Sequence, residues 1–223
     1  MMSAIQSIFF PITHLVEMGG PVIAILLAVS IFALTIGLYQ LWRHHGARVG
    51  RHQDIRRAIA QWDSGDREAA QSTLVKSRHY LAPILRLGTE LKDLSGARQR
   101  LEAEAEQKFA SLERGLRTLD IIAQLAPLLG LFGTVIGMIE AFQALQGAGS
   151  QVDPSVLAGG IWVALLTTAA GLAVAMPASI ALSWFEARMD AERTLAETAF
   201  ATILTPTESD MAAQAKEPAF HVA

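Results

Sequence analysis

The pattern of apolar and polar positions predicts three helices that cross a membrane. Residues 119–145 and 156–185 are long apolar segments without Lys or Arg, and residues 21–42 form a third such segment. Each reaches the length of about 20 apolar residues that spans the hydrocarbon core of a bilayer as an α-helix. Because only the short polar loop 146–155 separates the second span from the third, these two spans predict a membrane hairpin.

The segments outside the spans also carry helical patterns. Residues 43–118 repeat apolar residues at helical spacing, and Asp66 follows a turn where it can cap the next helix. From Leu101 to Leu119 one apolar stripe continues without an evident breaker, which predicts a helix that runs unbroken into the second span. Residues 186–204 likewise predict a helical continuation of the third span.

The two ends of the chain differ from this pattern. Residues 1–20 mix apolar side chains with His14 and Glu17, which is typical of a helix that lies at a membrane interface. Residues 205–223 contain Pro and scattered polar residues, which predicts a disordered tail.

Small residues follow one side of each hairpin helix. They recur three or four positions apart in both segments, and such stripes let helices approach closely in lipid. Pro127 and Pro177 lie inside the spans, where the lost backbone hydrogen bonds need other partners. We expect that one hairpin alone does not satisfy these features, which predicts an oligomer. The proposed packing residues are Gly130, Gly133, Gly137, Gly160, Ala164, Gly171, Pro127 and Pro177.

Three threonines, Thr134, Thr167 and Thr168, interrupt the stripes at mid-membrane depth. A hydroxyl in that position either donates to a carbonyl of its own helix or lines a hydrated path. The pattern by itself leaves both interpretations open.

The positive charges lie on one side of the predicted membrane. All 18 Lys and Arg fall within 43–117, 188–193 or at Lys216, and none precedes Trp42 or lies in the loop 146–155. Since cytoplasmic loops carry the excess of Lys and Arg, residues 43–118 and the carboxyl terminus are predicted to be cytoplasmic, and the amino terminus periplasmic. The net charge of −3 gives no indication of nucleic-acid binding.

The sequence contains no recognisable catalytic or metal-binding motif. There is no Cys and no HExxH motif, and the six His residues do not have the spacing of metal ligands. We therefore expect neither an enzyme nor a metal or cofactor. Glu140 lies about 28 Å along the second span, at the outer interface, where it is either a solvated acid or a residue that attracts cations to a pathway. Asp153 and Pro154 are expected to start the third span as cap and first helical residue.

Two motifs in the hairpin resemble a known family. The segment 126–138, APLLGLFGTVIGM, and the segment 160–177, with ALLTTAAGL followed by AMP, resemble the MotA/TolQ/ExbB proton-channel family. Three spans and a modest cytoplasmic insert favour its ExbB/TolQ branch. The resemblance implies an all-α protein of the bacterial inner membrane with three transmembrane helices and long cytoplasmic helical extensions, assembled as a homo-pentamer.

The resemblance also implies partners. In the family, the pentamer surrounds single-span proteins of the ExbD/TolR type that carry a membrane Asp, and proton flow drives a TonB/TolA-type protein in outer-membrane transport or envelope maintenance. Thr134 and Thr168 resemble the hydroxyls that line the chamber of the partner's Asp, and Thr167 and Glu140 complete the candidate proton pathway. One departure is Val163, which stands where ExbB relatives often carry Glu. The alternatives are a passive membrane scaffold or a solute channel that conducts alone.

Overall fold

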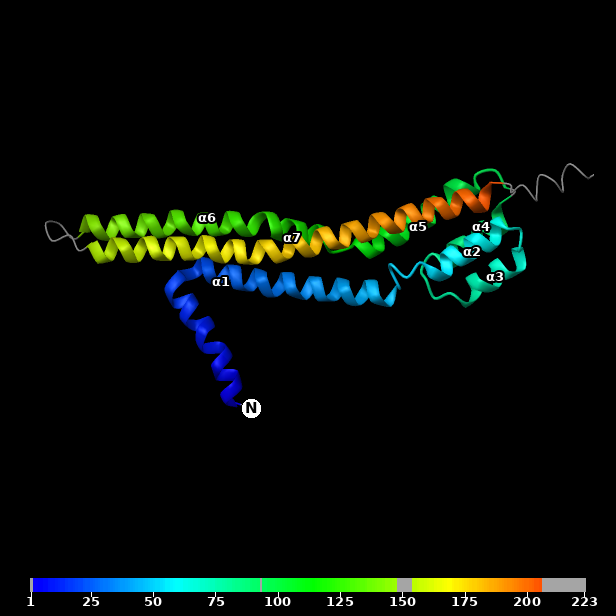
Figure 1. Ribbon diagram of the computed structural model, residues 1–223. Helices are drawn as coiled ribbons and strands as arrows, with labels where there is room; N and C mark the ends of the chain where they lie inside the picture. Colours follow the sequence, from blue (N-terminus) through cyan, green and yellow to red (C-terminus); the bar gives the residue numbers. More distant parts are fainter. Residues whose placement is uncertain (1, 93, 148–153, 206–223) are drawn as a thin grey trace, which may run out of the picture. The chain divides into compact units, whose positions relative to one another are not determined.

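The described part of the chain is entirely helical. The computed structural model describes residues 2–92, 94–147 and 154–205, with side chains from Gly20 onward, and within these ranges it contains seven helices and no strand (Figure 1). The all-α prediction is therefore confirmed. The predicted cap Asp153 and the predicted tail beyond Thr205 lie outside the described residues. The helices are α1 (Met2–Gly46), α2 (Gln53–Asp63), α3 (Arg67–Lys76), α4 (Ala82–Leu91), α5 (Ala97–Glu113), α6 (Leu116–Gly147) and α7 (Pro154–Leu204).

Three of these helices are long and apolar enough to cross a membrane. They are the part of α1 from Gly20 to Gly46, the whole of α6, and α7, which at 51 residues exceeds the length of a span. Gly20 has φ 64° and ψ −161°, so it interrupts α1 and separates an amino-terminal helical stretch from the apolar one. Since glycine adopts such angles without a steric penalty, the Gly-Gly-Pro sequence at this point sets the start of the first apolar helix.

The predicted unbroken helix from Leu101 to Leu119 is wrong. Helix α5 ends at Glu113, Arg114 leaves the helical region with ψ 115°, and Gly115 has φ 108° before α6 begins. A glycine with positive φ commonly ends an α-helix. The sequence pattern did not indicate this break, because the apolar stripe continues across Gly115. The side chains of Gln40 and His44 donate to the carbonyl of Leu112, at 3.0 Å and 3.2 Å, so this end of α5 has hydrogen-bond partners.

Helix α7 is continuous from Pro154 to Leu204, which confirms the predicted helical continuation of the third span. Pro127 and Pro177 both lie inside uninterrupted helices. One apolar stripe of the carboxyl-terminal part of α7 is buried; its members are Phe185, Met189, Ala196, Phe200 and Ile203.

The chain divides into two compact units. The first contains residues up to Tyr39 together with Gly115–Trp184, and so holds most of the apolar length of the three long helices. In its core, Val22 and Leu26 of α1 pack with Ala126 of α6 and Ala175 of α7.

The second unit contains Gln40–Arg114 and the chain from Phe185 onward. Apolar side chains of α2 to α5 and of the end of α7 form its core, with Ile55, Leu85 and Leu101 fully buried. Asp66 accepts a hydrogen bond from the backbone N–H of Ala69 at 3.1 Å, which confirms its predicted role as the cap of α3.

Candidate functional site

Helices α6 and α7 pack backbone to backbone where their glycines meet. A Cβ atom placed on Gly130 would lie 2.8 Å from the carbonyl oxygen of Thr167, and one placed on Gly171 would lie 2.6 Å from that of Ala126. Real Cβ atoms essentially never come this close to a backbone oxygen. Only glycine therefore fits these two positions, and the two helices approach as closely as small-residue packing permits.

The other small residues continue this seam. Gly137 faces Ala164, Gly160 faces Ala141, and Gly133 lies against Thr167. Helices α6 and α7 lie side by side (Figure 1), and their two stripes pack against each other within one chain. The prediction that a single hairpin cannot satisfy them is wrong, because the fold pairs the stripes directly. The small-residue stripes therefore give no evidence for an oligomer.

The three threonines of the hairpin occupy different environments. Thr167 is buried in the seam, and its hydroxyl lies 2.7 Å from the carbonyl oxygen of Ala164 and 3.3 Å from that of Gly130. Thr168 is half-buried and lies 3.5 Å from the same Gly130 oxygen. Thr134 is also half-buried and donates to the carbonyl of Leu131 at 2.6 Å.

Thr134 of α6 and Thr168 of α7 lie about one helical turn apart along the hairpin. Thr168 reaches Gly130, and Thr134 follows Gly130 by four residues, which is about 6 Å along a helix. Both hydroxyls have lone pairs that remain after their donated bonds, and neither side chain is enclosed within the hairpin. The hairpin therefore presents two hydroxyl acceptors within its apolar segments.

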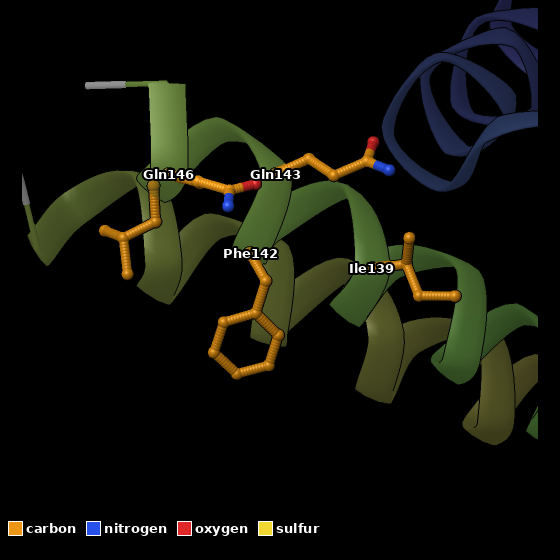
Figure 2. Close-up of a pocket in the computed structure, with 5 residues that line it drawn as sticks. Ile139, Phe142, Gln143 and Gln146 are labelled. Atoms are coloured by element: carbon orange, nitrogen blue, oxygen red, sulfur yellow. The ribbon is translucent and has the colours of Figure 1, made fainter. Parts of the chain in front are cut away.

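Glu140 is exposed on α6, away from the seam. Near it, a hollow of about 590 Å³ is lined by Ile139, Phe142, Gln143, Leu145 and Gln146. Figure 2 shows these side chains, four of them labelled, and all of them come from the last turns of α6. Because one helix supplies the whole lining, the hollow is an open surface groove and not an enclosed binding site.

Large apolar side chains cover the outer face of the hairpin. Val163 is half-buried, and its neighbour Trp162 is exposed. On α6 the exposed apolar residues include Leu128, Leu131, Phe132, Val135, Ile139 and Phe142. In water such a surface would be unstable, whereas lipid or other apolar helices can cover it.

A polar cluster that sequence reasoning missed surrounds Glu192 in the second unit. Glu192 is fully buried, and its carboxylate accepts hydrogen bonds from the backbone N–H of Gly50 and from the hydroxyl of Tyr80, the latter at 2.8 Å. Nε2 of His52 lies 2.7 Å from one carboxylate oxygen, and Nε2 of His79 lies 3.4 Å from the other.

Electrostatics favour the charged form of this carboxylate. Burial by itself would raise the pKa of Glu192, but the imidazoles of His79 and His52, the Gly50 N–H and the Tyr80 hydroxyl together outweigh it and lower the pKa to about 2. Burial, with the charge of Glu192 nearby, raises the pKa of the Tyr80 hydroxyl, which therefore stays a hydrogen-bond donor. No local sequence motif indicates this cluster, because His52 and Glu192 are 140 positions apart in the sequence.

The sequence of this chain is similar to those of known transport proteins. The model of the MotA/TolQ/ExbB proton channel family matches residues 63–198, more than half of the chain. A protein of Synechocystis sp. named ExbB-like 1 is 36% identical over 170 residues, which cover 71% of this chain and 64% of that protein.

Two further relatives extend the comparison. A protein of Methanothermobacter thermautotrophicus named as an ExbB homolog is 32% identical over 82% of this chain and 66% of its own length. The Tol-Pal system protein TolQ of Haemophilus influenzae is 37% identical over 98 residues, which cover 44% of this chain and 42% of that protein. The chain spans just under two thirds of the length of the first two relatives.

Proposed function

This chain belongs to the MotA/TolQ/ExbB proton channel family, and we propose that it is the multi-span subunit of a proton-driven motor in the bacterial inner membrane. The proposed partner is a single-span protein of the ExbD/TolR type whose membrane-embedded Asp carries the proton. The motion is passed to a TonB/TolA-type protein, which serves outer-membrane transport or envelope maintenance.

The observation that carries this proposal is the pair of half-buried hydroxyls at Thr134 and Thr168 in the part of the hairpin that has no charged residue. Residues 121–139 and 156–185 contain no Asp or Glu, so this chain supplies no titrating acid at mid-membrane depth. A proton pathway through this region needs a carboxylate from another chain. The two hydroxyls can accept a hydrogen bond from the protonated form of that carboxyl group and hold water beside it, while the partner supplies the titrating acid.

The energetics of such a carboxylate suit a motor. One proton that crosses 100 mV releases about 2.3 kcal/mol, and insertion scales place the cost of a charged Asp at the membrane centre at about 2.5 to 3.5 kcal/mol. Since the two free energies are similar, protonation and deprotonation can switch a partner helix between two positions. The exposed Glu140, two turns before the end of α6, would at most attract protons to the entrance of the proposed pathway.

The proposed arrangement has the amino terminus and the loop between α6 and α7 in the periplasm, and residues 43–118 and the carboxyl terminus in the cytoplasm. The one-sided distribution of Lys and Arg supports it. A homo-pentamer around the partner helices is proposed from the family. The exposed apolar face of α6 supports an assembly, because neighbouring subunits can cover it.

The test replaces each threonine by valine, which keeps the branched shape and removes only the hydroxyl. Thr134→Val and Thr168→Val should each abolish proton-dependent transport in cells, while the subunit and its partner still co-purify. Thr35→Val is the matched control, since Thr35 is exposed on α1 and its hydroxyl also donates within its own helix, to Ile31 at 2.8 Å. Transport by this variant should equal that of the wild type.

Full transport in the Thr134→Val, Thr168→Val double variant would return both residues to a packing role. In that case each hydroxyl contributes only about 0.6 kcal/mol, the mean for interhelical hydrogen bonds in a membrane protein. A passive scaffold predicts this result, whereas a channel that conducts alone predicts proton leakage from the purified subunit in vesicles without any partner.

A further inference from the structure

The cluster around Glu192 has the composition of a metal site. His52, His79 and Glu192 each offer one ligand atom, and these atoms all lie within 4.8 Å of one another. The three residues come from separate segments, since His52 directly precedes α2, His79 lies between α3 and α4, and Glu192 is on α7. All three belong to the second unit.

The buried atoms of the cluster are not fully used by hydrogen bonds. His79 is buried, and its Nε2 atom makes no hydrogen bond although it points to Glu192 at 3.4 Å. A buried nitrogen without a hydrogen bond is unfavourable in an apolar interior. A metal ion bound to Nε2 would give this nitrogen a partner.

The neighbouring groups would orient these ligands. The Gly50 N–H and the Tyr80 hydroxyl each bind one oxygen of Glu192, so they hold the carboxylate in a fixed direction. The ring of Tyr80 stacks on that of His79, with centroids 4.7 Å apart and an interplanar angle of 28°. Outer groups of this kind are a regular part of metal sites in proteins.

We propose that His52, His79 and Glu192 bind one zinc ion. Two imidazole nitrogens and one carboxylate oxygen are a known zinc ligand set, which leaves a fourth position for water. Magnesium and calcium prefer sites built from oxygen ligands, so the two histidines disfavour them. The proposed site lies in the second unit, outside the hairpin, and is separate from the proposed proton pathway.

Small movements would complete the coordination. Ligand atoms that bind zinc tetrahedrally at about 2.0 to 2.2 Å lie about 3.3 Å apart. Nε2 of His79 lies at about this distance, 3.4 Å, from one oxygen of Glu192, whereas Nε2 of His52 lies 2.7 Å from the other, so the carboxylate must turn to place one oxygen near both histidines. His52 is partly exposed and can move outward.

One hydrogen bond opposes the proposed coordination. The N–H of Leu81 donates to Nδ1 of His79 at 3.3 Å, which in the neutral ring places the proton on Nε2. Zinc coordination through Nε2 needs the other neutral tautomer, in which the single ring proton sits on Nδ1 and this long hydrogen bond is lost.

The test measures zinc bound to the untagged, purified full-length chain in detergent. After removal of metal with a chelator, the wild type should take up one zinc per chain, as measured by mass spectrometry of the metal and by competition with a chromophoric chelator. His52→Ala should weaken binding by more than about tenfold, and Tyr80→Phe, which removes only an orienting hydroxyl, by about 10- to 100-fold. His45→Ala, a change at an exposed histidine, should bind as the wild type does.

Cobalt gives a second readout that needs no variant. Cobalt in the proposed four-coordinate site should produce strong visible absorption, which stoichiometric zinc removes. The proposal is overturned if the wild type binds no zinc above the level of His52→Ala, or if cobalt shows only the weak absorption of a hydrated ion. Either result would make the cluster a purely hydrogen-bonded anchor for Glu192.

Discussion

The seam between α6 and α7 gives the sharpest test of the packing described above. Gly171→Ala adds one methyl group where the nearest atoms are the carbonyl oxygen of Ala126, at 2.6 Å, and the Cα of Gly130, at 3.0 Å. Both are backbone atoms, so no side chain can rotate away. The two helices must separate or bend, which we expect to destabilise the hairpin.

The magnitude follows from two opposing effects. Overpacking of a close contact costs about 1–3 kcal/mol, whereas replacing glycine by alanine inside a helix contributes about 1 kcal/mol of stability. Gly159→Ala is the matched control, because it lies on the same helix with nothing within 4 Å of the added methyl group. The helix-propensity gain is common to both variants. Gly171→Ala should therefore be less stable than Gly159→Ala by about 1–3 kcal/mol.

The assay is reversible unfolding of the purified chain in mixed micelles, followed by circular dichroism. A third variant, Gly137→Ala, provides a graded comparison, since its nearest contact is an ordinary 3.4 Å to Cβ of Ala164. We expect the order of stability Gly159→Ala, then Gly137→Ala, then Gly171→Ala. Equal stability of the first and last variants would refute close backbone packing at this seam.

Two further predictions concern the second unit and the topology. Asp66→Ala should lower the free energy of unfolding by about 1 kcal/mol, because it removes the cap of α3. Thermal unfolding measures this, with Asp190→Ala, a change at an exposed aspartate, as the control. Equal melting temperatures of the two variants would contradict the prediction. Reporter fusions after Ser3 and within residues 147–151 should report the periplasm, and fusions near Gly96 the cytoplasm. A cytoplasmic signal from the loop fusion would exclude the proposed three-span orientation.

The sequence alone determined the helical class and the positions of the three apolar helices. Both depend on local properties, namely the length of apolar runs and the spacing of small and large residues. The cap at Asp66 and the buried stripe from Phe185 to Ile203 could be predicted for the same reason, since a helix presents residues three and four apart on one face.

Only the tertiary structure decided what each face contacts. The stripes of α6 and α7 were expected to need other subunits, but they pack on each other through Gly130 and Gly171, because periodicity shows that a face is suited to close packing and not which helix meets it. The break at Gly115 was hidden for a related reason, as the apolar stripe keeps its spacing across a residue whose backbone leaves the helix. The cluster of His52, His79 and Glu192 depends on segments distant in the sequence, so folding alone brings its ligand atoms together.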